Sequence, residues 1–256
     1  MANKTVHLPV VAGTANVRKD AWWAFPAFTV VCFSGFIVYA TWRAFEGASY
    51  EWQAYLSPFY SPFFDVGWAK GWGLSFFTPA MLILPGPASF RFTCYYYRKA
   101  YYRAFVGDPT ACAVPERSPH RYKGETRLLL FQNLHRYAMY VAVVFLVILW
   151  KDAIEAVVHW KDGVHLGVGS LVMIANCVLL SGYTFGCHSF RHMIGGNVNS
   201  YSQAALGNVR HGLWKLVTVL NERHQLFAWT SLFSVALTDL YIRMVATGAI
   251  TDARLF

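Results

Sequence analysis

The sequence has few charged residues. Asp, Glu, Lys and Arg make up 14% of its 256 positions, against about 25% in a typical soluble domain. Three stretches, residues 21–42, 71–90 and 163–190, contain none of these four residue types. A helix needs about 20 apolar residues to cross the hydrocarbon core of a bilayer. The scarcity of charge therefore argues against an ordinary soluble domain and predicts an integral membrane protein.

Two further apolar segments, residues 128–150 and 225–250, carry only isolated charges. We therefore predict an all-α integral membrane protein in which five transmembrane helices form a single membrane domain over residues 1–256. The predicted spans are residues 21–45, 72–95 (with the helix extending to about 104), 128–150, 166–191 and 221–247. Pro79, Pro85 and Pro87 predict a kink in the second span, because proline lacks a backbone donor and clashes with the preceding turn.

The sequence also lacks a recognisable signal peptide and a disulfide pattern. The first 20 residues are mixed polar and the first apolar run exceeds a signal h-region, so we expect that run to stay as an anchor. The five cysteines are an odd number, and none sits in a paired outer loop, which disfavours a disulfide framework. We expect Cys94, Cys112 and Cys187 to lie reduced on the cytoplasmic side.

The basic residues are distributed unevenly along the chain. The net charge is +9, and 16 of the 22 Lys and Arg residues fall on segments that the five-span reading places inside the cell. Such a bias predicts a cytoplasmic N-terminus, an external C-terminus and a multi-pass protein of the cell inner (plasma) membrane. Because topology and attraction to anionic lipid explain the basic excess, we expect no nucleic-acid partner.

Histidine and cysteine gather where the predicted spans enter or leave the inner side of the membrane. Ionisable groups at membrane depth are costly, so they usually face the bundle interior and mark function. Cys32 and Cys177 are mid-span in apolar surroundings, where a free cysteine packs as a small hydrophobe. The residues that share the inner layer are Cys94, His135, Cys187, His188, His192 and His224.

Three kinds of metal group suit such a layer. Two thiols and two imidazoles suit a Rieske-type [2Fe–2S] cluster, in which cysteines hold one iron and histidines the other. A zinc Cys2His2 site would use the same residue types for a structural purpose. The first two spans contain no histidine, which excludes two stacked haems, but one inner haem b between His135 and His224 remains an alternative.

Several motifs resemble one known family, the membrane-anchor (cytochrome-b-like, SdhC) subunit of actinobacterial, mycobacterial-type succinate dehydrogenase, which is respiratory complex II. The resemblance covers nearly the whole chain, and the motif at 91–103 is the most specific. The matching stretches are 55–62 (YLSPFYSP), 91–103 (RFTCYYYRKAYYR), 111–114 (ACAV), 124–127 (GETR), 132–137 (QNLHRY), 187–192 (CHSFRH), 221–224 (NERH) and 236–239 (ALTD).

The resemblance implies a five-helix anchor that binds a flavoprotein subunit and an iron–sulfur subunit of succinate dehydrogenase. It further implies a membrane Rieske-type [2Fe–2S] cluster and quinone as the electron acceptor, with menaquinone favoured by the actinobacterial likeness. We expect no succinate oxidation by the chain alone, because it has no flavin-binding fingerprint.

Three cysteines and four histidines in the matching motifs compete for four ligand positions. We predict Cys94, His135, Cys187 and His224 as the metal ligands, because one residue from each of four helices converges best on the bundle axis. Cys112 and His188 are kept in reserve.

In the resulting hypothesis, electrons arrive from an iron–sulfur partner on the cytoplasmic side and leave to quinone near the membrane surface. Quinone needs an apolar slot with a few polar groups, for which the candidates are Tyr97, Arg98, Arg136 and Trp229. The alternative functions are a haem-b cytochrome anchor and a purely structural membrane anchor without a redox centre. The basic residues expected to seat the partner are Arg98, Lys99, Arg103, Arg117, Arg121 and Lys123.

Overall fold

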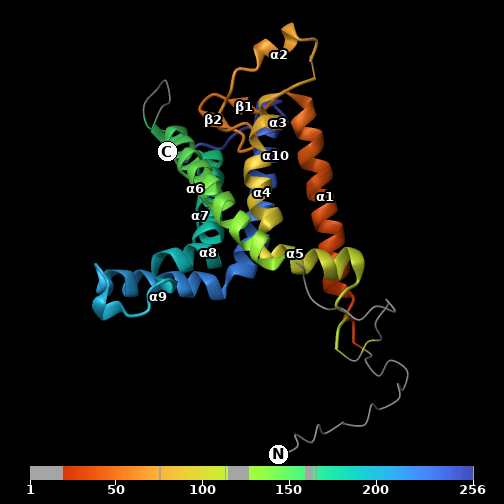
Figure 1. The fold of residues 1–256 in the computed structure, drawn as a ribbon. Coiled ribbons are helices and arrows are strands. Elements are labelled where there is room, and N and C mark those ends of the chain that lie inside the picture. The colour runs from red at the N-terminus through yellow and green to blue at the C-terminus, as the bar shows by residue number, and fades with distance from the viewer. Residues whose placement is uncertain are drawn as a thin grey trace, which may run out of the picture.

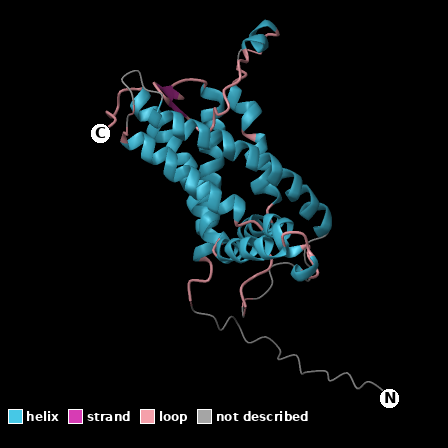
Figure 2. Cartoon of the chain, turned by 90° about the vertical axis from the view of Figure 1, so that its left-hand side faces the viewer, coloured by secondary structure: helices cyan, strands magenta, loops and turns pink. Residues whose placement is uncertain are grey.

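The computed structural model describes residues 20–74, 76–112, 114, 127–158, 164 and 166–255. Long helices run side by side, and shorter helices cross one end of the bundle (Figure 1). The view turned by 90° shows the same arrangement (Figure 2). We call the crossed end the inner end and the opposite end the outer end. The long helices are α1 (Ala24–Glu46), α6 (Leu128–Val158), α7 (Val168–Phe185) and α10 (His224–Ala246).

The second predicted span is divided into short helices. The helix expected over 72–95 and on to about 104 is interrupted before Pro79, at Leu84 and at Cys94. Pro79 and Pro85 each start a helix, because the first helical position needs no backbone N–H donor. The pieces are α3 (Pro79–Ile83), α4 (Pro85–Thr93), α5 (Tyr95–Tyr101) and the π-helix η1 (Tyr102–Val106). A separate short helix, α2 (Gly67–Gly71), precedes them.

The inner end carries helices that run across the bundle rather than along it. α5 and α9 (Gly207–Glu222) lie this way, roughly perpendicular to the long helices (Figure 1). The span expected over 166–191 therefore ends earlier, with α7, and the span expected over 221–247 starts as a new helix, α10. Short helices connect α7 to α9: α8 (His188–Arg191), η2 (His192–Gly196) and η3 (Tyr201–Gln203).

The outer end contains a small β-hairpin that the all-α prediction misses. Strand β1 (Glu51–Trp52) pairs antiparallel with β2 (Tyr55–Leu56). Three aromatic residues in and after it are buried: Tyr55, Phe59 and Tyr60 are at most 1% exposed. α6 continues to Val158, beyond the expected end at residue 150. The hairpin region therefore forms a packed cap over the outer ends of the long helices.

The isolated charges of the last span pair with each other. Arg243 Nε donates to Asp239 Oδ2 at 2.9 Å, one helical turn away on α10. The hydroxyls of Tyr39, on α1, and of Ser57, next to the hairpin, also donate to Asp239. A second Arg243 donor reaches Glu46 Oε2 at 3.1 Å. These contacts compensate a buried ion pair and tie α10 to α1 and to the cap.

Within the described residues, two helices, α1 and α7, are both long and apolar enough to cross a membrane. α10 has 23 residues but carries Asp239 and Arg243, and α4 has only nine residues. Length and composition alone therefore support two candidate spans.

Candidate functional site

The structure brings Cys94, His135, Cys187 and His224 to one place. All four line a cavity of about 340 Å³ at the inner end, which we call the Cys/His cavity. The first lies between α4 and α5, the second on α6, the third between α7 and α8, and the last begins α10. Four segments that are far apart in the sequence thus converge where the long helices meet the crossing ones.

Breaks in the helices position both thiols. Cys94 (ψ 124°) and Cys187 (ψ 141°) each have an extended backbone between two helices, so that the chain turns at the cysteine itself. Both side chains are buried, at 3% and 2% exposure. The backbone N–H of Ser189 donates to Cys187 Sγ at 3.3 Å, which caps α8. Each thiol is therefore held by the backbone turn that creates the inner layer.

The four side chains form two thiol–imidazole pairs. His135 Nε2 is 3.0 Å from Cys187 Sγ, and His224 Nε2 is 3.7 Å from Cys94 Sγ. All four side chains line the same cavity, so the two pairs border one shared space.

Thr93 sets the tautomer of His135. Its hydroxyl has a single hydrogen, which it donates to the carbonyl oxygen of Ser89 at 2.7 Å. The same oxygen is 3.0 Å from His135 Nδ1 and accepts the Nδ1–H bond. His135 Nε2 is then unprotonated and directs its lone pair toward Cys187, which is the form of imidazole that binds a metal.

Two aromatic rings cover the imidazoles. Phe90 stacks on His135 with ring centroids 4.7 Å apart, and Tyr183 stacks on His224 at 5.0 Å. The Tyr183 hydroxyl and His224 Nδ1 are buried and have no hydrogen-bond partner among the described residues. The hydroxyl lies beside the Cys94 sulfur. The polar groups of this site are thus incompletely paired.

The reserve ligands lie at the edge of the site or away from it. His188 lines the Cys/His cavity but is exposed. Cys112 is exposed and does not line this cavity. Cys177 is buried in a different apolar cluster, nearer the outer end, together with Tyr55.

The candidate quinone residues do not share one pocket. Tyr97 donates its hydroxyl to the carbonyl of Ala228 at 2.6 Å, and its ring lies 6.2 Å from that of Trp229. Arg98 lines the Cys/His cavity. Arg136 is exposed and has one guanidinium nitrogen 3.4 Å from His192 Nδ1.

The basic docking surface expected from the sequence is only partly described. Arg98 is 4% exposed, with its guanidinium over the Phe131 ring, so it cannot belong to an exposed surface. Lys99 and Arg103 are exposed. The other expected members, Arg117, Arg121 and Lys123, lie outside the described residues.

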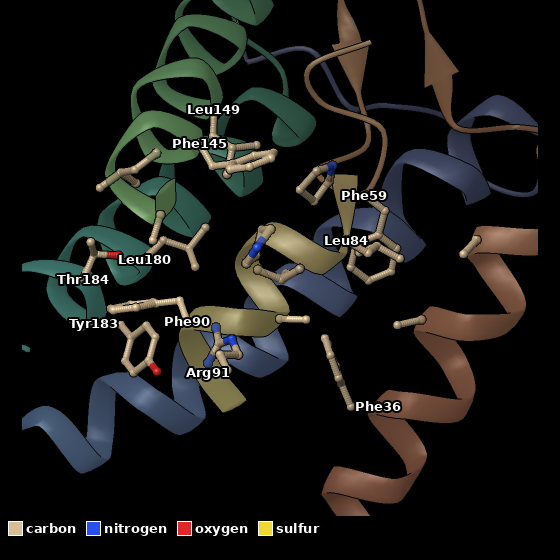
Figure 3. A pocket seen from close by; sticks show the side chains of 18 of the residues that line it. Phe36, Phe59, Leu84, Phe90, Arg91, Phe145, Leu149, Leu180, Tyr183 and Thr184 are labelled. Carbon is tan, nitrogen blue, oxygen red and sulfur yellow. The ribbon is translucent and has the colours of Figure 1, made fainter. Parts of the chain in front are cut away.

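A second cavity, which we call the central cavity, adjoins this site. It measures about 350 Å³, and its lining includes Phe90, Arg91 and Tyr183 (Figure 3). From the sequence, Arg91 was expected only to contribute to the excess of basic residues on the inner side. Its place directly after a charge-free stretch of 20 residues, 71–90, is the signal that could have marked it.

No three ligand-type side chains surround a single point. Among the described residues, no group of three or more His, Cys, Asp and Glu side chains is placed to hold one metal ion. The arrangement is instead two pairs around a cavity.

Comparisons with known proteins agree on one family. The family model of the actinobacterial succinate dehydrogenase subunit SdhC matches residues 24–248. Among solved structures, a chain of the Mycobacterium smegmatis Sdh1 complex in the apo form is similar, with 42% sequence identity and a TM-score of 0.82. That likeness covers 97% of this chain and 98% of the other. The comparison with curated proteins returns no match.

Proposed function

Since the chain belongs to the family of the actinobacterial succinate dehydrogenase subunit SdhC, we propose that it relays electrons from an iron–sulfur subunit to quinone. As a member of that family it is the membrane-anchor subunit of an enzyme complex in the plasma membrane. Its partners are a flavoprotein subunit and an iron–sulfur subunit. Succinate chemistry belongs to the complex and not to this chain alone.

We further propose that α1, the α3–α4 pair, α6, α7 and α10 are five spans in a single membrane domain, with the inner end in the cytoplasm. The parallel arrangement of these helices supports this reading (Figure 1). So does the gathering of 16 of 22 basic residues on the segments assigned to the inner side. The buried pairing of Asp239 with Arg243 makes the charges of α10 compatible with a membrane span.

A Rieske-type [2Fe–2S] cluster, held by Cys94, Cys187, His135 and His224, is the metal group that this donor set fits. Such a cluster takes two protein ligands per iron and carries one electron at a time. The observation that supports it most is that two thiols and two imidazoles line one cavity. In the structure each thiol lies beside an imidazole, so binding of the cluster would replace these contacts by two cysteines on one iron and two histidines on the other. The buried, unpartnered Nδ1 of His224 also fits a site built to receive a further group.

The surrounding residues have distinct tasks in this proposal. Thr93 keeps His135 Nε2 available as a ligand, and the Ser189 N–H stabilises negative charge on the Cys187 sulfur. Phe90 and Tyr183 shield the imidazoles from the rest of the bundle. The exposed Lys99 and Arg103 stand at the inner end, where an iron–sulfur partner would dock.

The test uses the whole succinate dehydrogenase complex, purified with and without substitutions. We expect a Rieske-type EPR signal in the reduced wild-type complex that is lost in Cys94→Ser and in Cys187→Ser, together with two irons per complex. Electron transfer to quinone should stop, while the other subunits stay bound. Cys177→Ala is the matched control, because it removes a cysteine that is equally buried but lies outside the site.

Three results would contradict this proposal. A Soret band assignable to this chain would favour a haem-b anchor. Zinc bound at these residues without an EPR signal would favour a structural anchor. An EPR signal that persists in both serine variants would place the cluster elsewhere.

A further inference from the structure

An arginine inside the helix bundle lies one aromatic ring away from the proposed ligands. Arg91 is on α4, and its guanidinium lies 4.6 Å from the centre of the Tyr183 ring (Figure 3). The same ring stacks on the imidazole of His224 at a centroid distance of 5.0 Å and an interplanar angle of 14°. Tyr183 is therefore in contact both with the guanidinium and with a ligand candidate of the Cys/His cavity.

Neutral groups hold this guanidinium in place. Arg91 Nη1 donates to the Tyr97 hydroxyl at 2.7 Å and to the Ala228 carbonyl at 3.2 Å. Its Nη2 donates to the Ser231 hydroxyl at 2.9 Å. No Asp or Glu among the described residues forms an ion pair with it. These bonds fix the position of the guanidinium without cancelling its charge.

A charge at such a depth is normally paired, because burial of an isolated charge is costly. Arg243, at the outer end, follows this rule through its contacts with Asp239 and Glu46. Arg91 instead lines the central cavity, whose lining is almost wholly apolar. Since apolar surroundings screen a charge much less than water does, its field extends to neighbouring groups.

The group whose charge changes in the proposed relay is the cluster. Two ferric ions, two sulfides and two thiolates carry no net charge together, and one added electron makes the cluster negative. A fixed cation nearby stabilises the reduced form more than the oxidised form, and so raises the redox potential. At about 10 Å and an effective dielectric constant of about 20, two unit charges shift an equilibrium roughly tenfold.

We propose that the charge of Arg91 raises the redox potential of the cluster held by the Cys/His site. The inference rests on the electron relay proposed above. One electron moves in this step: the iron–sulfur partner is oxidised and the cluster is reduced, while Arg91 keeps its proton and is not a ligand. Arg91 is thus a positioning residue that acts through its field, and it makes the cluster a better acceptor for the partner's electron.

A second arginine stands closer to the site. Arg98 lines the Cys/His cavity itself and donates to the Thr93 carbonyl at 3.1 Å. All the variants of the test leave Arg98 unchanged, so that differences between them report the charge at Arg91.

The test is an EPR-monitored redox titration of the cluster in the assembled complex. Ser231 is fully buried on α10 and accepts from the guanidinium, so a substitution there changes the charge beside Arg91 and keeps the arginine. Ser231→Asp adds a carboxylate that pairs with it, and Ser231→Asn is the matched neutral control of the same shape. Arg91→Gln removes the charge, and Arg91→Lys keeps it. Iron content and melting temperature show whether each variant is loaded and folded.

We expect the midpoint potential to fall in Arg91→Gln and in Ser231→Asp. The ratio of reduced to oxidised cluster at a fixed ambient potential should drop about tenfold, which is about 59 mV for a one-electron couple. Arg91→Lys and Ser231→Asn should stay close to the wild type. Because the two Ser231 variants disturb the packing alike, the difference between them reports charge, and it decides the question even if Arg91→Gln does not assemble.

Three results would overturn this inference while the relay stands. They are equal potentials in Ser231→Asp and Ser231→Asn, a wild-type potential in Arg91→Gln, and a fall in Arg91→Lys as large as that in Arg91→Gln. The last would assign the effect to geometry and not to charge. Absence of the cluster signal from the wild-type complex would instead remove the relay, and the role of Arg91 with it.

Discussion

The two ends of the bundle both bury polar side chains, but they pair them differently. At the outer end both carboxylate oxygens of Asp239 accept hydrogen bonds, from Ser57, Tyr39 and Arg243, although Arg243 Nη2 has no partner among the described residues. At the inner end His224 Nδ1 and the Tyr183 hydroxyl have no partner among the described residues. Two thiols face two imidazoles there across a cavity.

This difference in pairing identifies the outer end as a structural network and the inner end as a candidate binding site. Buried polar groups that satisfy one another hold elements together, whereas incompletely satisfied groups around a space suit an additional ligand. Substitutions at the outer end should therefore change stability and leave electron transfer intact. Substitutions at the inner end should do the reverse.

The largest effect is expected from Asp239→Ala at the outer end. It leaves the buried guanidinium of Arg243 without its main counter-ion, which typically costs about 3–5 kcal/mol. Thermal unfolding of the detergent-solubilised complex measures the loss, and the EPR spectrum should not change. The double variant Asp239→Leu with Arg243→Met should recover most of the stability. An unchanged melting temperature in Asp239→Ala would contradict the structural role of the outer-end network.

At the inner end, Thr93→Val should weaken the cluster. It removes the oxygen that accepts from His135 Nδ1 while keeping the shape of the side chain. Loss of such a supporting bond typically lowers metal affinity by about 10–100-fold. Iron content after graded chelation measures it. Thr29→Val is the control, because Thr29 is also buried and donates to the carbonyl four residues back. Equal iron retention in the two variants would contradict the role of Thr93.

Tyr183→Phe should shift a redox potential more than it shifts stability. The hydroxyl lies beside the Cys94 sulfur and has no partner among the described residues, so a Cys94 thiolate that holds a cluster would accept its hydrogen bond. A donor to a ligand sulfur stabilises the reduced state. One hydrogen bond contributes about 1 kcal/mol, which lowers the potential by about 40 mV when it is lost. An EPR-monitored redox titration of the complex decides this. A potential equal to that of the wild type would show that the hydroxyl has no such contact.

Tyr55→Phe at the outer end should, in contrast to Tyr183→Phe, change stability and not the redox potential. We expect it to have the smallest effect of these variants. Burial raises the pKa of Tyr55 to about 12, so its hydroxyl stays protonated and donates to Asp252 at 2.7 Å. Its loss should cost about 1 kcal/mol of stability, seen as a small drop in melting temperature, with an unchanged redox potential. A shift in potential would mean that the two ends are coupled.

Some features of the site could be predicted from the sequence. Cys94, His135, Cys187 and His224 stand at the inner ends of four apolar segments. Because the ends of such segments lie at one depth in the membrane, the sequence was enough to predict that these residues lie close together. The break at Cys94 could not be predicted, since no glycine or proline stands beside it to signal the end of a helix. The break at Cys187 follows Gly186, the C-cap of α7, and that glycine is a signal that could have predicted it. The hairpin was also missed, because each strand has only two residues.

The helical class, the layer at which thiols and imidazoles gather, and the family could all be read from the amino-acid sequence, because hydropathy and local motifs are properties of the chain. The packing of the helices adds which histidine meets which cysteine, that Asp239 and Arg243 share one hydrogen-bonded network, and that Arg91 faces an apolar cavity. Those outcomes depend on how distant helices rotate and pack against one another, and packing is specified by the whole set of contacts and not by any single segment.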